Sequence, residues 1–406
     1  MRKFLDKNNW LREVFKNTGV QVLGKMAGIG ISLLVTRILT RKLGVADYGV
    51  FLLIQSVLIL LGAGADAGTT IVGVRELVQS RDFKRERADL FGLRFLTTSL
   101  AFFISLLVLC WYRPLIPYRG AGFLAFAMIW GTMLAGNWEI LAQVKRQFEY
   151  KVMGEILFAG GFLGLVWGKK ELSLAWVFGI YLLIRGLSLA IVALFKREWL
   201  EGISFKSSFE RMGRLWKKCW PMGLYLFIFT SYDKAVDSLM IRNFLGAREV
   251  GWYGLSYKVY NSLVLGAYFF VSSVYPLLAA GKKREQILKW GRVLLLTTGG
   301  IAAVVLWFAA APAIQWLGGR EFWPAIKVLQ ILGVALVFSY LNHLSGFNLV
   351  AKGGQKKLLS LGTVALIFNV MGNIFVIPRW GINGAAWITA GTEGLMFLLY
   401  GLVIKK

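Results

Sequence analysis

The chain has 406 residues, of which 57% are hydrophobic and 17% charged, with a formal net charge of +26 and a mean hydropathy of +0.61. This apolar content excludes an ordinary soluble domain of the same size. The basic residues stand in short clusters between apolar runs rather than on one face or tail, so the charge does not indicate nucleic-acid binding. Cytoplasmic loops and contact with anionic membrane lipid explain the charge better.

The apolar runs predict an all-α polytopic membrane protein. Each run is about 18 to 25 residues long, enough to cross about 30 Å of hydrocarbon, where helices satisfy every backbone polar group. A basic, amphipathic segment at 1–17 precedes the first run as an interfacial lead-in, and 196–218 is the longest connection, a cytoplasmic linker. We place twelve spans, at 18–40, 48–68, 90–112, 120–143, 152–168, 172–195, 219–243, 250–276, 291–312, 324–348, 358–378 and 382–403.

The connections between these spans differ in charge. Those on the side of the N-terminus carry about three times as many Lys and Arg residues as those on the other side, which is the positive-inside pattern. Both termini are therefore expected to be cytoplasmic, with the chain in the cell (inner) membrane.

A short motif occurs twice. LGVADYGVF (Leu43–Phe51) and LGAREVGWY (Leu245–Tyr253) share Leu-Gly, a second Gly and a final aromatic residue, and their starts lie 202 residues apart. Ala175-Trp176 and Ala386-Trp387 form a fainter second pair. Because six spans precede the linker and six follow it, the sequence predicts a parallel repeat with an N-lobe at 18–195 and a C-lobe at 219–406, and a substrate path between them.

Four basic residues inside or at the edge of the spans are candidates for a cationic, substrate-binding cavity. Ionisable groups are costly in lipid and usually face a bundle interior or a wet cavity. Lys25, Arg185 and Lys258 lie well inside their spans, where they would bind a pyrophosphate or an acidic sugar. Arg37 is nearer the outer interface, where structural pairing or snorkelling is the alternative. The alternative for the other three is pairing with a neighbouring acid.

A second group combines acids with a lysine. Asp233 and Asp237 are four residues apart and share a helix face, which Lys234 flanks; Asp66 and Glu139 lie in earlier spans. These residues are candidates either for proton or sodium coupling or for a polar seam between helices.

Aromatic and metal-binding patterns give a further set of expectations. Tyr253, Tyr257 and Tyr260 recur at helical spacing and would stack on sugar rings or on neighbouring helices. The single histidine, His343, and the two cysteines provide neither a metal site nor a catalytic set, so we expect no cofactor, no metal and no enzyme activity.

Several motifs in order along the chain resemble those of one family. They are RILTRKLGVADYGVF (Arg37–Phe51), Asp66-Ala-Gly, Val74-Arg-Glu-Leu77, SSVYPLLA (Ser272–Ala279), GREFWPAIKVLQIL (Gly319–Leu332) and IPRWGINGAAWIT (Ile377–Thr389). Nearly the whole chain thus resembles the lipid-linked oligosaccharide flippases, the Wzx-type polysaccharide transporters of the multidrug/oligosaccharidyl-lipid/polysaccharide superfamily.

The resemblance implies a MATE-like fold of two six-helix lobes that alternate access to a cationic cavity. It implies translocation of a polyprenyl-pyrophosphate-linked oligosaccharide from the cytoplasmic to the outer leaflet, for surface polysaccharide biosynthesis. Glycosyltransferases and a polymerase of the same pathway would be partners, and we expect a monomer. The alternatives are a cation-coupled multidrug antiporter of the same superfamily, which would need a cavity dominated by acids, and a membrane glycan polymerase or ligase. The short outer connections disfavour the polymerase or ligase.

Overall fold

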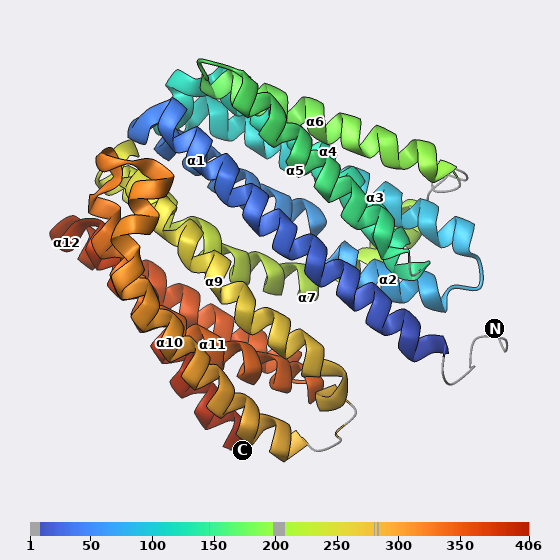
Figure 1. Cartoon of the computed structure of the whole chain (residues 1–406). Helices are drawn as coiled ribbons and strands as arrows, with labels where there is room; N and C mark the ends of the chain where they lie inside the picture. Colours follow the sequence, from blue (N-terminus) through green and yellow to red (C-terminus); the bar gives the residue numbers. More distant parts are fainter. Residues whose placement is uncertain (1–8, 146, 198–207, 280, 282–283, 406) are drawn as a thin grey trace. The chain divides into compact units, whose positions relative to one another are not determined.

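The computed structural model describes residues 9–145, 147–197, 208–279, 281 and 284–405, and within these ranges every regular element is a helix. Figure 1 shows the long helices. Short elements lie between some of them, namely η2 (Arg113–Tyr118), η4 (Ser231–Ala235) and η5 (Arg320–Phe322). The long helices are α1 (Asn9–Asp66), α2 (Thr69–Gln79), α3 (Phe83–Trp111), α4 (Arg119–Val144), α5 (Phe148–Gly168), α6 (Leu174–Phe195), α7 (Phe209–Thr230), α8 (Val236–Phe244), α9 (Ala247–Ala279), α10 (Arg284–Gly318), α11 (Pro324–Ala351) and α12 (Gln355–Lys405).

The length and apolarity of these helices confirm a multi-pass, all-α membrane protein. Among the described residues, eight helices are long and apolar enough to cross a membrane. Two of them each join two helical segments, because Gly44 (φ 73°) interrupts α1 and Gly381 (φ 58°) interrupts α12. The twelve expected spans are consistent with these elements.

The two copies of the repeated motif coincide with breaks in helical geometry. Gly44 in the first copy has φ 73°, and Gly246 in the second, between α8 and α9, has φ 156°. Side chains with a Cβ rarely adopt this left-handed region, so the shared Leu-Gly pair marks the point at which the chain turns. The chain therefore turns at the same position in each copy of the motif.

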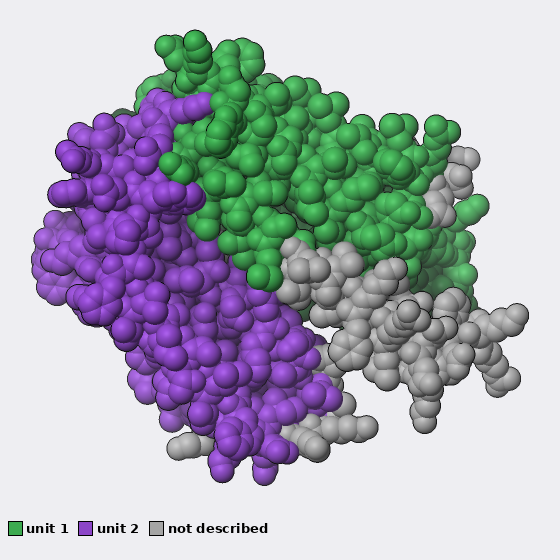
Figure 2. Space-filling view, in the orientation of Figure 1, with its two compact units in different colours: residues 1–38, 58–227 green, residues 39–57, 228–406 purple. Residues whose placement is uncertain are grey.

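The chain divides into two compact units, which Figure 2 colours separately. Unit 1 comprises residues 1–38 and 58–227, and unit 2 comprises residues 39–57 and 228–406, as far as these are described. The segment 39–57, which holds the first copy of the motif, is therefore packed within the unit that holds the second copy. The division into lobes at 18–195 and 219–406, with a lead-in and a linker, stays a prediction.

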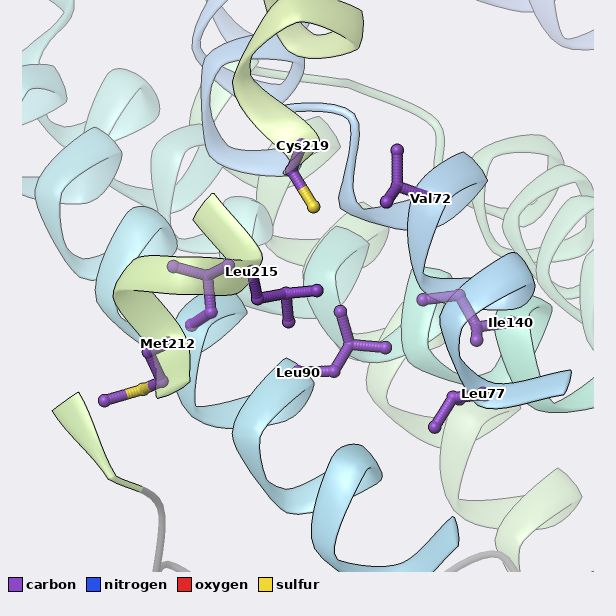
Figure 3. Packing of buried hydrophobic residues seen from close by; sticks show 8 residues of the cluster. Val72, Leu77, Leu90, Ile140, Met212, Leu215 and Cys219 are labelled. Carbon is purple, nitrogen blue, oxygen red and sulfur yellow. The ribbon is translucent and has the colours of Figure 1, made fainter. Parts of the chain in front are cut away.

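Unit 1 is built around α4, which packs against α2, α3, α5 and α6. The first turns of α7, which fall in the predicted linker, are helical and bury one face against this unit. Figure 3 shows Met212, Leu215 and Cys219 of α7 facing Leu90 of α3 and Val72 of α2. This apolar contact anchors the start of α7 to helices that come more than 100 residues earlier in the sequence.

Unit 2 is built around α11, which packs against α9, α10 and α12. The segment 39–57 is fixed to this unit by polar and aromatic contacts. Thr40 donates to the carbonyl of Leu317 at 2.7 Å. Arg41 Nη2 donates to the carbonyls of Gln315 and Trp316, both at 3.2 Å, near the C-terminus of α10, where a positive charge also suits the helix dipole.

The two copies of the motif meet through their second glycines. A Cβ on Gly49 would overlap the carbonyl oxygen of Ala247, and a Cβ on Gly251 would overlap that of Val45. Gly49 and Gly251 hold the same position in the two copies. Small residues permit this close approach of helix backbones. In lipid, where no hydrophobic driving force acts between helices, such packing is a main source of helix association. The repeated motif therefore packs helices of unit 2 together, and the duplication that it suggests stays a prediction.

We predict that Gly49→Ala destabilises the protein strongly, because its Cβ has no room beside the Ala247 carbonyl and the two helices must separate. Overpacking of this kind costs about 1–3 kcal/mol or more. The measurement is the thermal unfolding midpoint of the purified protein in detergent. Gly300→Ala in α10 is the matched control, because no heavy atom lies within 4 Å of its added Cβ. Equal midpoints for the two variants would contradict the packing argument.

Candidate functional site

Unit 1 encloses a polar cavity with a volume of about 310 Å³. This is at the lower end of the range for small-molecule sites. Three of the sequence-predicted residues, Asp66, Glu139 and Arg185, line it together, although they come from three different helices. Two residues that the sequence analysis did not single out, Arg94 and Glu155, line it as well.

Arg94 on α3 is the most buried charged group of the cavity, with 2% of its surface exposed. Its Nη1 donates to Asp66 Oδ1 at 2.8 Å and to the hydroxyls of Thr69 and Thr70 at 2.6 and 3.0 Å. Its Nη2 donates to the carbonyl of Met133 on α4 at 3.4 Å. Arg94 thus ties the junction of α1 and α2 to α3 and α4, and this set of acceptors compensates for burying a guanidinium.

The other two acids of the cavity also have basic partners. Glu139 on α4 pairs with Lys151 on α5 and accepts from Gln143 Nε2 at 3.3 Å. Glu155 on α5 pairs with Arg185 on α6, with Nη1 and Oε1 2.9 Å apart. The three acids therefore each have a cation beside them, so the cavity combines both signs of charge and is not purely cationic.

Unit 2 contains a buried carboxylate, Asp237, in the first turn of α8. It accepts hydrogen bonds from Tyr253 Oη at 2.5 Å, from Asn373 Nδ2 at 2.8 Å and from Thr389 Oγ1 at 3.2 Å. In the part of the chain that the structure describes, no Lys, Arg or His forms an ion pair with it. Among the described residues, hydroxyl and amide groups are the donors to this carboxylate, and the buried Oδ1 of Asn373 has no hydrogen-bond partner there.

The helix changes geometry just before Asp237. Residues 231–235 form the π-helix η4, so the predicted single span at 219–243 consists of α7, η4 and α8. Short π-helical segments occur often at functional sites because they re-aim the side chains that follow. The side chains of Asp233 and Lys234, which fall in η4, lie outside the described residues, so their expected pairing with Asp237 stays a prediction.

The three tyrosines of α9 stack on one another. The rings of Tyr253 and Tyr257 are 5.8 Å apart and those of Tyr257 and Tyr260 are 5.4 Å apart. Tyr253 and Tyr260 are each 2% exposed, whereas Tyr257 is half-buried. Stacking on sugar rings stays a prediction, and Tyr257 has the most accessible ring of the three.

The remaining candidates are dispersed. Arg37 on α1 and Lys258 on α9 are half-buried, and both take part in interactions. Lys25 lies on α1, and its side chain is outside the described residues. His343 Nδ1 is 2.8 Å from the carbonyl oxygen of Ser339, which fits the contact of a helix-bound histidine. Within the described residues no group of three or more His, Cys, Asp and Glu could hold a metal ion.

Neither Arg94 nor Glu155 is predicted as a site residue from the sequence, for a physical reason. Both lie within about four residues of a predicted span boundary, where a long charged side chain ordinarily reaches the interface. Their i-to-i+4 neighbours gave no hint of a partner, because the partners Asp66 and Arg185 are 28 and 30 residues away.

Comparisons with known proteins show which proteins resemble this chain in sequence and in fold. No protein-family model matches the chain. The teichuronic acid biosynthesis protein TuaB of Bacillus subtilis (strain 168) is 18% identical over 281 residues, which cover 64% of this chain and 57% of that relative. The match therefore spans little more than half of the curated relative's length.

Solved structures resemble the chain over nearly all of its length. The lipid II flippase MurJ in an inward closed conformation has a TM-score of 0.77 at 12% identity, covering 95% of this chain and 87% of its own. An inward-facing multidrug resistance MATE transporter of the MOP superfamily has a TM-score of 0.74 at 14% identity, covering 92% and 94%. The chain thus has the MATE-like fold, and the proteins that share it are transporters and flippases rather than enzymes.

We predict that Arg94→Met destabilises unit 1 markedly, because Asp66 loses the guanidinium that compensates its charge. Breaking a buried ion pair from one side costs about 3–5 kcal/mol. The measurement is again the unfolding midpoint in detergent. Arg214→Ala, which breaks the exposed pair with Glu210 on α7, should cost less than about 1 kcal/mol. A small effect at Arg94 would mean that the pair is not structural.

Proposed function

We propose that the protein translocates a polyprenyl-pyrophosphate-linked oligosaccharide from the cytoplasmic to the outer leaflet, for surface polysaccharide biosynthesis. The observation that carries this proposal is the agreement between the sequence comparison and the structure comparison. The relative detected by sequence is named for teichuronic acid biosynthesis, and the fold is shared with a lipid II flippase. One name gives the biosynthesis of teichuronic acid and the other gives the flipping of a lipid, and together they favour a lipid-linked saccharide as the cargo. The multidrug transporters alone would not suggest that cargo.

In this proposal the lobes rock about the cargo, and no covalent chemistry takes place. The prenyl chain stays in lipid while the pyrophosphate and sugars cross through the protein. Lys25, Arg185, Lys258 and Arg37 are the proposed headgroup contacts. Arg185 has the best support for this role, because it lines the cavity of unit 1 and its side chain is 13% exposed. Tyr257 is the proposed stacking surface for a sugar ring.

We further propose that Asp237 couples translocation to a proton or a sodium ion. A buried carboxylate held only by hydroxyl and amide groups has a large cost for staying charged, which a bound cation or proton removes. The unpartnered Oδ1 of Asn373 offers a second oxygen beside it. Asp233 and Lys234 stay candidates for the same site, and a polar seam without ion binding is the competing interpretation.

A cation-coupled multidrug antiporter is the second candidate. Its support is the gathering of Asp66, Glu139 and Glu155 at one cavity, together with the MATE structures that share the fold. The basic partner beside each of these acids disfavours the antiporter, because a cavity for cationic drugs needs negative charge that no cation neutralises. A glycan polymerase or ligase has less support still, since the proteins of this fold are transporters.

The proposed setting is the cytoplasmic membrane, with both termini on the cytoplasmic side and the protein a monomer. Contact with anionic lipid is supported by α7, whose outer face carries exposed Phe209, Trp216 and Trp220 beside the basic Arg214 and Lys217. Aromatic and basic residues together favour the interface of an anionic membrane. Glycosyltransferases and a polymerase of the same pathway are the proposed protein partners.

We predict that alanine at Lys25, Arg185 or Lys258 reduces glycan export at least tenfold while the protein stays in the membrane. Each variant removes a cation that offsets the desolvation of the pyrophosphate. The measurement is movement of labelled lipid-linked oligosaccharide between the leaflets of proteoliposomes. Arg75→Ala, which removes a side chain that is 58% exposed, is the control and should export normally. Full export by all three variants would refute the cationic headgroup contacts.

We predict that Asp237→Asn slows export and removes its dependence on the pH or sodium gradient. The amide keeps the shape of the side chain but can neither bind a proton in this range nor supply a charged oxygen. The measurement is the export rate in proteoliposomes with imposed proton or sodium gradients. Glu285→Gln, at the exposed start of α10, is the matched charge control. If Asp237→Asn keeps the wild-type gradient dependence, the network is a structural seam.

A further inference from the structure

Three ion pairs surround the cavity of unit 1, and they differ in how firmly each is held. In the pair of Arg94 and Asp66, the arginine side chain is 3% exposed and the aspartate side chain 24% exposed, and several further acceptors fix the arginine. The pair of Arg185 and Glu155 is different, because 53% of the Glu155 side chain is exposed. The Arg185 side chain is only 13% exposed, so Glu155 is the partner that solvent can stabilise when the pair opens.

Arg185 keeps its position without Glu155. Its Cζ lies 3.8 Å from the centre of the Phe158 ring, a close cation–π contact. Tyr181 packs edge-on against Phe158, with ring centres 4.7 Å apart, and so fixes that ring. Gly131 on α4 leaves room for the Arg185 stem, whose Cγ would lie 3.0 Å from an added Cβ. The guanidinium is therefore held in place by its aromatic and aliphatic surroundings.

Glu155 fills the position on Arg185 that an oxyanion from outside would take. A guanidinium fork presents paired N–H donors that match carboxylate and phosphate oxygens equally well. The wall of the same cavity also holds a buried hydroxyl, Thr98 Oγ1, which has no hydrogen-bond partner among the described residues. A polar ligand bearing an oxyanion and hydroxyl groups would satisfy both features.

We propose that Glu155 is an internal counter-ion that an oxyanion of the cargo displaces from Arg185. The cavity of unit 1 is then a subsite for an anionic saccharide headgroup, and Glu155 sets its selectivity because an anion must compete with the Glu155 carboxylate for the Arg185 guanidinium. This inference rests on the proposed function for the identity of the cargo, but the exchange itself is a property of unit 1. The oxyanion is either the pyrophosphate or the carboxylate of an acidic sugar.

Equilibrium binding to the purified full-length protein in nanodiscs of neutral lipid tests the exchange. The probes are inorganic pyrophosphate, methyl glucuronide and methyl glucoside, titrated calorimetrically. Glu155→Gln removes the competing charge, so it should bind an anionic probe about three- to fivefold more tightly than the wild type. Binding of neutral methyl glucoside should not change. A gain for pyrophosphate alone identifies the lipid linkage as the source of the oxyanion, and a gain for methyl glucuronide alone identifies an acidic sugar.

Three variants separate the exchange from simpler effects. Glu149→Gln removes the same charge from the exposed start of α5, away from the Arg185 contact, and should leave every affinity unchanged. The double variant Glu155→Gln/Arg185→Gln should lose the gain. Glu155→Ala should reproduce the gain without the amide. The proposal is overturned if neither Glu155 variant binds an anion more tightly, or if the double variant keeps the gain.

Failure of this inference is distinguishable from failure of the proposed function. Unchanged anion affinity in the Glu155 variants overturns the exchange, while export of lipid-linked oligosaccharide by the wild type would still support the flippase. Conversely, a gain that depends on Arg185 supports the exchange even where proteoliposomes carry no lipid-linked oligosaccharide across.

Discussion

The contact between Gly49 and the Ala247 carbonyl, mirrored by Gly251 and the Val45 carbonyl, is the constraint on which unit 2 depends. In lipid there is no hydrophobic driving force for helices to associate, because lipid tails are as apolar as the side chains. Close backbone approach and polar contacts must therefore hold the helices together. Here the two copies of one motif supply that approach to each other. The residues around the crossing, from Thr40 to Tyr48, can then reach α10 and η5.

The pairing of charged side chains in this protein also follows from its membrane environment. A charge inside a membrane protein requires a partner, and nearly every charged group at the unit 1 cavity has one. In unit 2, the buried Asp237 differs from these groups, because among the described residues only neutral donors contact it. This difference matches the two roles that we propose. The ion pairs of unit 1 suit the binding of a charged cargo, which can replace one partner of a pair. The Asp237 carboxylate, without a cationic partner among the described residues, suits the binding of a small cation or a proton.

The sequence predicts the helical membrane fold and the corner glycines because both depend on local properties, namely the length of apolar runs and the need for positive φ at Gly44 and Gly246. Asp66, Glu139 and Arg185 were found by their placement inside apolar runs. Their partners were not, because pairing across helices depends on packing between residues distant in the chain. The π-helix η4 and the packing of 39–57 with unit 2 likewise leave no local signal.

The balance of charge around the unit 1 cavity has an electrical consequence. A carrier whose empty site has equal numbers of positive and negative groups moves little net charge when it returns unloaded. Under the proposed function, the membrane potential then acts on the cargo and on any coupling ion, but little on the charges of this cavity. Each elementary charge that crosses 100 mV corresponds to about 2.3 kcal/mol. Because the cell interior is negative, this energy drives an anionic headgroup outward and leaves the return of the empty protein nearly insensitive to voltage.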